Sequence, residues 1–168
     1  MLETVIVAVA VLLDRLSKIW AMHSLTGLPN MQTTLIPGVL DLHYVQNTGA
    51  AFSMMQGMRW LFIPITLIIV GVLTFYLVKQ RKTESIYTRI ALASVIGGAL
   101  GNLVDRIIYG YVVDMLEPSI IAFAVFNVAD VFVTCGTIAL VELILFSSSE
   151  GTKKTVSSNE APCEKESI

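Results

Sequence analysis

The sequence predicts an all-α membrane protein with four transmembrane helices and a small extracytoplasmic β-rich element. The chain is 55% hydrophobic and only 14% charged, whereas a soluble domain carries about a quarter charged residues. Four apolar stretches are also long enough to cross a hydrocarbon core, which takes about 20 helical residues. They lie near residues 4–22, 60–78, 88–108 and 126–146.

Ionisable residues interrupt the first and third apolar stretches. Asp14 and Lys18 lie in the first, and Asp105 and Arg106 lie in the third. A charged side chain within a bilayer costs at least about 2.5–3.5 kcal/mol, so each of these residues needs a partner or a functional purpose. All four are therefore candidates for a functional site.

The distribution of basic residues predicts the topology. Lys79, Arg81 and Lys82 lie between the second and third stretches, and three more lysines lie in the C-terminal segment. The other two loops, about 25–58 and 109–125, contain no Lys or Arg. Basic loops stay in the cytoplasm, so we expect both termini to be cytoplasmic and these two loops to be extracytoplasmic.

The two outer loops carry the patterns of strands. Polar and apolar residues alternate over Leu40–Val45 after a Pro37-Gly38 turn, and a turn followed by a strand is expected over 109–114. Residues 1–146 are thus predicted to form one membrane domain with a small outer sheet. The Ser-rich, charged segment 147–168 is predicted to be a disordered cytoplasmic tail.

Polar residues of the predicted spans fall at one depth when the topology is applied at 1.5 Å per helical residue. That depth is near the outer ends of the helices, and the residues are Asp14, Lys18, Asn102, Asp105, Arg106, Asn127 and Asp130. Ala93, Gly97, Gly101 and Asp105 recur every four residues and form one stripe of the third span. Small residues allow close helix packing, so this stripe should turn Asp105 towards the bundle rather than towards lipid.

Counting charges at this depth leaves two aspartates without a local cation. Asp14 and Lys18 are four residues apart and can pair on one helix, and two cations, Lys18 and Arg106, are set against four aspartates. Asp114 and Asp130 are the pair left over. Two carboxyls close together favour one protonated and one ionised group, which together can activate a water molecule against a peptide carbonyl.

Other functions fit the same residues less well. An intramembrane proton-coupled transporter or channel subunit would use the aspartates as a relay, but it usually shows internal repeats and a site at mid-membrane, which this sequence lacks. A serine nucleophile, Ser17 or Ser53, with Lys18 as base has poor geometry, because adjacent helical residues point about 100° apart.

Metal, cofactor and nucleic-acid chemistry have no signal in the sequence. The two cysteines, Cys135 and Cys163, have no metal-ligand spacing and give no disulfide framework. No basic face suited to nucleic acid occurs, and the net charge is −2. We therefore expect no metal, no cofactor and no nucleic-acid partner.

Five ordered motifs resemble those of the lipoprotein signal peptidases, the signal peptidase II family. They are Asp14-Arg-Leu-Ser-Lys18, Asn47-Thr-Gly-Ala-Ala-Phe-Ser53, Gly97-Gly-Ala-Leu-Gly-Asn-Leu-Val-Asp-Arg106, Val112-Val-Asp114 and Phe126-Asn-Val-Ala-Asp130. The chain differs from the common family pattern at Met115, at Val131 and in its short connection from 114 to 130. None of these differences removes a candidate catalytic group.

The resemblance implies an aspartic endopeptidase of the bacterial cytoplasmic membrane. Such an enzyme removes signal peptides from diacylglyceryl-modified prolipoproteins, cleaving before the lipidated cysteine. We also expect a monomer among membrane phospholipids, and the predicted topology puts the active site near the extracytoplasmic face. The resemblance implies catalytic roles for Asp114 and Asp130, and substrate-binding or supporting roles for Asp14, Lys18, Asn47, Gly49, Asn102, Asp105, Arg106 and Asn127.

Overall fold

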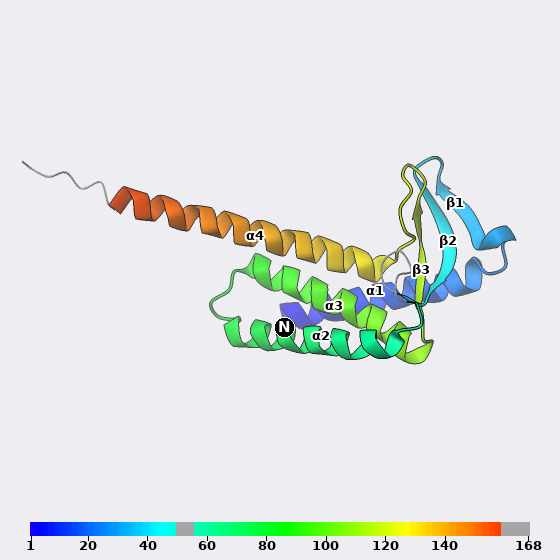
Figure 1. The fold of residues 1–168 in the computed structure, drawn as a ribbon, viewed down its shortest axis with the longest axis horizontal. Coiled ribbons are helices and arrows are strands. Elements are labelled where there is room, and N and C mark those ends of the chain that lie inside the picture. Colours follow the sequence, from blue (N-terminus) through cyan, green and yellow to red (C-terminus); the bar gives the residue numbers. More distant parts are fainter. Residues whose placement is uncertain (50–55, 159–168) are drawn as a thin grey trace, which may run out of the picture.

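The computed structural model describes residues 1–49 and 56–158, with side chains up to residue 145. The part of the Asn47–Ser53 motif that follows Gly49, including Ser53, lies outside the described residues. Four helices form the body of the protein, and a small sheet lies at one end of them (Figure 1). The helices are α1 (Leu2–Ser24), α2 (Arg59–Gln80), α3 (Ile86–Ile108) and α4 (Val128–Ser158).

Three of these helices contain a segment long and apolar enough to cross a membrane. They are α2, α3 and the Val128–Leu145 part of α4. Helix α1 has 23 residues, which is sufficient length, but Asp14, Arg15 and Lys18 lower its hydropathy. All four predicted helices are present, and three of them have the composition of a membrane span.

Helix α3 is the centre of the bundle because its glycines allow the neighbouring helices to come close. A Cβ atom at Gly97 would lie 2.7 Å from the Cβ of Ala10 on α1, and one at Gly98 would lie 2.4 Å from the carbonyl oxygen of Ala129 on α4. Both distances are shorter than van der Waals contact. The small-residue stripe therefore faces the bundle, as predicted, and it faces α1 in particular.

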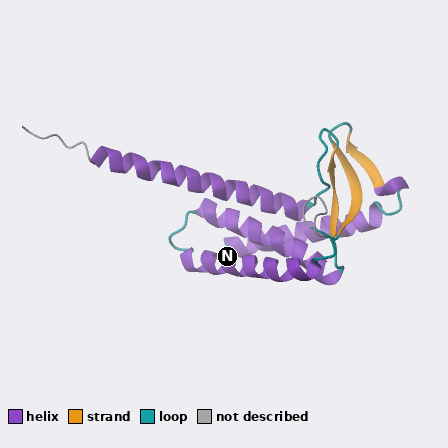
Figure 2. Ribbon diagram, viewed as in Figure 1, coloured by secondary structure: helices purple, strands orange, loops and turns teal. Residues whose placement is uncertain are grey.

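The sheet is antiparallel in the order β1-β2-β3 and crosses the end of the bundle (Figure 2). After a short 3-10 turn, Pro29–Met31, come β1 (Gln32–Ile36) and β2 (Leu40–Asn47), and β3 (Val112–Pro118) follows α3. Both predicted strands are confirmed as β2 and β3. The sequence did not single out β1, because most of its residues are exposed and no alternating pattern arises.

The sheet is fixed to the end of α1 by a small apolar core. Leu42 and Tyr44 of β2 and Val113 of β3 are buried against Ala21 and Leu25 at the C-terminal end of α1. Register then places Asn47 opposite Val112, and Val45 opposite Asp114. The end of β2 and the start of β3 are thereby held over the bundle.

Helix α4 differs from its prediction at the C-terminal end. It continues past residue 146 to Ser158, so the stretch 147–158 is helical where disorder was predicted. The sequence contains no proline between Val128 and residue 161, so no residue of this stretch lacks the backbone N–H that a helix needs. Residues 159–168 of the predicted tail lie outside the described residues.

Candidate functional site

The structure brings all ten predicted site residues together at the sheet end of the bundle. With Arg15, which was not predicted, they form one set of hydrogen bonds and ion pairs that we call the polar network. Its members are Asp14, Arg15, Lys18, Asn47, Gly49, Asn102, Asp105, Arg106, Asp114, Asn127 and Asp130. They come from α1, β2 and the residues after it, α3, β3, and the start of α4.

Asp114 lies on β3, and its side chain is almost completely buried. Two amides hold the carboxyl: Asn127 Nδ2 donates to Oδ1 at 2.6 Å, and Asn47 Nδ2 donates to Oδ2 at 2.9 Å. Burial disfavours the charged form and raises the pKa of Asp114 to about 6, against the opposing effect of the two amide donors. This carboxyl can therefore carry a proton close to neutral pH.

Asp130 lies in the first turn of α4 and shares a reciprocal cap with Asn127. Asn127 Oδ1 accepts from the Asp130 amide at 3.0 Å, and Asp130 Oδ2 accepts from the Asn127 amide at 3.2 Å. This is the arrangement of a capping box, which satisfies otherwise unpaired amides at a helix start. Asn102 Nδ2 donates to the remaining oxygen of Asp130 at 2.8 Å.

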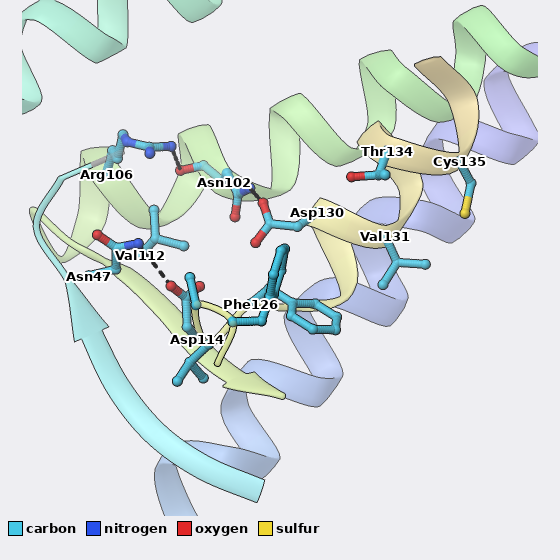
Figure 3. Close-up of a pocket in the computed structure, with 13 residues that line it drawn as sticks. Asn47, Asn102, Arg106, Val112, Asp114, Phe126, Asp130, Val131, Thr134 and Cys135 are labelled. Atoms are coloured by element: carbon cyan, nitrogen blue, oxygen red, sulfur yellow. Dashed lines mark hydrogen bonds between the residues drawn. The ribbon is translucent and has the colours of Figure 1, made fainter. Parts of the chain in front are cut away.

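Asn127 therefore connects the two aspartates through one buried side chain. Its oxygen caps α4 beside Asp130, and its amide nitrogen binds Asp114. Asp114 and Asp130 also line the same cavity of about 550 Å³ (Figure 3). Among the described residues, neither carboxyl forms an ion pair.

The lining of the cavity combines polar and apolar groups. Asn47, Asn102, Arg106 and the two aspartates supply the polar groups. The other lining residues are Val112, Phe123, Ala124, Val125, Phe126, Val131, Thr134 and Cys135. A ligand with both a peptide group and hydrocarbon chains would find a matching surface for each part.

Arg106 is a cation at the edge of this cavity. Its guanidinium donates to the carbonyl oxygen of Gly49 at 3.3 Å and to that of Asn102 at 3.4 Å. It also lies over the ring of Phe62, 5.2 Å from the centroid. Arg106 thus fixes the chain that follows β2 against α3.

Lys18 supports the site from α1. Its Nζ lies 2.9 Å from Asp14 Oδ2, from Asp105 Oδ2 and from Asn102 Oδ1, and the lysine is fully buried. Because Asn102 accepts from Lys18 with its oxygen, its nitrogen is directed at Asp130. Lys18 therefore determines how the Asn102 amide is oriented.

Asp14 joins α1 to the start of α4. Its Oδ1 accepts from the backbone amide of Ala129 at 3.0 Å, an interaction favoured by the positive end of the helix dipole. A Cβ atom at Gly101 would lie 2.6 Å from Asp14 Oδ2. Glycine at this position leaves the room that the carboxylate occupies.

Arg15 is the residue that the sequence analysis missed. Its Nη2 lies 2.5 Å from Asp105 Oδ1, so three cations rather than two face the four aspartates. The charge count was wrong because it left out Arg15, three positions before Lys18 on the same helix, where the i, i+3 spacing makes the two residues neighbours. Counting every ionisable residue of the first span would have found it.

The serine and lysine of α1 do not form a catalytic pair. Ser17 Oγ donates to the backbone carbonyl of Asp14 at 2.9 Å. Lys18 is occupied by Asp14, Asp105 and Asn102. A buried ammonium held by two carboxylates is a poor general base.

The fold and the cavity define a helical membrane protein with two carboxyls at one polar site. Residues 6–146 match the family described as signal peptidase (SPase) II. The chain therefore belongs to the signal peptidase II family, whose members are peptidases, and it is a bacterial membrane protein.

Individual relatives and a solved structure agree with this family. The lipoprotein signal peptidase of Clostridioides difficile (strain 630) is 41% identical over 150 residues, covering 89% of this chain and 99% of the relative. That of Streptococcus agalactiae serotype V is 41% identical over 147 residues, covering 88% and 94%. A solved structure described as a bacterial membrane enzyme at 2.3 Å resolution matches with a TM-score of 0.79 and 27% identity, covering 98% of this chain and 94% of that one.

Proposed function

We propose that this protein is an aspartic lipoprotein signal peptidase in which Asp114 and Asp130 form the catalytic dyad. Removal of signal peptides from prolipoproteins is the activity that its family membership gives. The observation that carries the dyad is that both carboxyls line one cavity and are joined through Asn127. The transporter or channel alternative finds no support in the relatives.

We infer the roles of the two carboxyls from their different environments. Asp114, with its pKa raised to about 6 by burial, is the protonated member and the general acid. Asp130 receives hydrogen bonds from the Asn102 side chain and from the Asn127 backbone amide, which suit an ionised general base. These roles place the single proton of the working dyad on Asp114.

The reaction follows general acid-base catalysis. Asp130 takes a proton from water as the water oxygen bonds to the scissile carbonyl carbon, and Asp114 gives its proton to the carbonyl oxygen. The resulting gem-diol collapses as the carbon–nitrogen bond breaks. Asp130 then protonates the leaving amine, and one hydroxyl of the diol returns a proton to Asp114, so that the enzyme is regenerated.

The apolar residues of the cavity lining suit a lipid-modified substrate. Phe126 and Val131 lie beside the two aspartates, so diacylglyceryl chains can lie against them while the peptide reaches the dyad. We infer cleavage before the lipidated cysteine. Arg106, at the polar edge, is placed to donate to backbone carbonyls of the substrate, and unchanged turnover in an Arg106→Lys enzyme would contradict this role.

The charge pattern supports a particular placement in the membrane. Lys79 lies in the last turn of α2, and Arg81 and Lys82 follow this helix, at the end of the bundle opposite the sheet. Basic segments face the cytoplasm. We infer four transmembrane helices including α1, both termini in the cytoplasm, and an active site near the extracytoplasmic face of the cytoplasmic membrane. We also infer that the enzyme works as a monomer surrounded by phospholipid.

Cleavage of a diacylglyceryl-modified prolipoprotein by the purified enzyme in detergent tests the proposal. Asp114→Asn and Asp130→Asn should each lower kcat by at least about 1,000-fold, because each removes one proton-transfer group. Asp41→Asn, the same change at a carboxylate of the sheet that binds Ser119 outside the cavity, should leave kcat unchanged. Wild-type turnover in either dyad variant would overturn the dyad.

A further inference from the structure

Arg15 of α1 belongs to the polar network through its contact with Asp105. Its guanidinium binds Asp105 Oδ1 at 2.5 Å and lies over the ring of Tyr109, 5.9 Å from the centroid. The side chain is 17% exposed, whereas Asp105 is fully buried. Arg15 does not line the cavity, so any effect on the reaction must pass through another residue.

Asp105 is that residue, because it connects the helices to the strand that carries Asp114. While Oδ1 binds Arg15, its Oδ2 binds Lys18 at 2.9 Å and accepts from the backbone amide of Val113 at 3.2 Å. Val113 is the residue immediately before Asp114. One carboxylate with both oxygens occupied thus ties the backbone of β3 to α1 and α3.

With Arg15 counted, one proton on the dyad is enough to bring the net charge of the polar network to zero. The ionisable groups that face one another are Asp14, Arg15 and Lys18 from α1, Asp105 and Arg106 from α3, Asp114 from β3 and Asp130 from α4. The nearby tyrosines are Tyr44, Tyr109 and Tyr111, and hydrogen bonding to Tyr44 raises the pKa of Tyr111 to about 12, which keeps it neutral.

Three cations against four carboxyls give a net charge of −1 when every group is ionised, and zero when the dyad holds one proton. A buried cluster is favoured when its net charge is zero. Without Arg15 the same cluster would need a second proton to become neutral.

We propose that Arg15 is a positioning residue for the peptidase reaction: it holds Asp105 against β3 beside Asp114 and supplies the third cation of the polar network. This inference rests on the proposed role of Asp114. Arg15 would then be a residue that the reaction requires although it lies outside the cavity, because it acts through the carboxylate of Asp105.

Arg15→Gln tests the proposal in the cleavage assay. The structure predicts a loss of about 10–100-fold in kcat with little change in KM, because the substrate cavity is intact while Asp114 is less well held. Removal of a positive charge favours the protonated carboxyls, so both limbs of the pH–rate profile should move to higher pH. Arg15→Lys should recover part of kcat through its charge, but not the geometry of the guanidinium.

A double-mutant comparison identifies the route of the effect. If Arg15 acts through Asp105, then adding Arg15→Gln to an Asp105→Asn enzyme should cost little more than Asp105→Asn alone. Arg81→Gln, the same change at an exposed arginine at the other end of the bundle, should keep wild-type kcat and pH profile. A merely structural role for Arg15 would reduce the amount of folded enzyme without moving either limb.

The outcomes separate this inference from the proposed function. Wild-type kcat and an unmoved pH profile in Arg15→Gln, with Asp114→Asn inactive, would overturn the role of Arg15 and leave the dyad in place. An additive double variant would overturn the route through Asp105. Full activity of Asp114→Asn would instead remove the proposed function on which the inference rests.

Discussion

The two ends of the helix bundle bury carboxylates with opposite charge balance. At the end opposite the sheet, Glu3 is surrounded by cations: Arg89 donates to it through Nε at 2.6 Å, Arg81 lies at 3.4 Å, and the N-terminal amine lies at 3.3 Å. At the sheet end, four carboxyls face three cations. Cations in excess keep a carboxylate ionised, whereas carboxyls in excess retain a proton.

This difference in charge balance indicates that one end of the bundle contributes to stability and the other to activity. The Glu3 cluster consists of Glu3, Arg81, Arg89 and the N-terminal amine, and it joins α1 to α3 and to the residue after α2. None of these groups lines the cavity at the sheet end. The polar network has a cavity beside it and a carboxyl that can change its protonation near neutral pH. We expect substitutions at the first end to affect stability alone, and those at the second to affect activity.

Loss of Asn127 should give the largest effect among the supporting residues. Asn127→Ala removes the bond to Asp114 and the cap beside Asp130, so we expect kcat to fall about 100-fold in the cleavage assay. Asn127→Ser restores a capping side chain without the amide donor, so it should recover thermal stability but not activity. Asn159→Ala, the same truncation near the C-terminus, serves as the matched control. Normal turnover in Asn127→Ala would show that the two aspartates do not need this connection.

The pH dependence of the enzyme should follow the protonation of Asp114. Its pKa of about 6 lies above the ordinary value of 3.8, so kcat should fall as pH rises through about 6 and the general acid loses its proton. The same ionisation destabilises the folded state, because the folded protein binds this proton more tightly than the unfolded chain does.

Asp114→Asn should therefore have a free energy of unfolding up to about 3 kcal/mol larger than wild type at pH 8, and a similar one at pH 3.5. Thermal unfolding in detergent at both pH values measures this difference. Asp41→Asn should show no such gain. A difference between Asp114→Asn and wild type that is the same at both pH values would contradict the raised pKa.

Gly101→Ala should lower both stability and activity. The added Cβ would lie 2.6 Å from Asp14 Oδ2 and 3.3 Å from the Cβ of Ala129, so α1 and α4 must move apart where they hold the site. We expect a loss of about 1–3 kcal/mol in stability together with reduced kcat. Gly27→Ala, where nothing lies within 4 Å of the added atom, should do neither. Unchanged unfolding of Gly101→Ala would mean that α3 does not need glycine at this contact.

Glu3→Gln should give the smallest effect and the clearest separation of the two ends. It weakens the interactions with Arg89 and Arg81, so the unfolding temperature in detergent should fall while kcat and the pH profile remain those of wild type. Arg15→Gln, further along the same helix, should instead lower kcat and move the pH profile. A changed pH profile in Glu3→Gln would show that the charges of the two ends are coupled.

Much of the architecture could be predicted because its signals are local. Apolar length marked all four helices, and alternation marked β2 and β3. The strand β1 has no such pattern, since it is exposed on both faces. The structure ends α4 at Ser158, beyond the predicted end near residue 146, because polar composition was interpreted as disorder; no proline interrupts the chain before Pro162.

The sequence by itself predicted ten residues of the candidate site, because charged and polar groups in an apolar chain are few and each one needs a partner or a purpose. The tertiary structure alone decided how those residues act on one another. Asn127 connects two carboxyls, Lys18 orients Asn102, and Arg15 binds Asp105 only because distant segments meet at one end of the bundle. Hydrogen bonds and ion pairs depend on distances of a few ångströms, and sequence spacing cannot supply these between separate helices and strands.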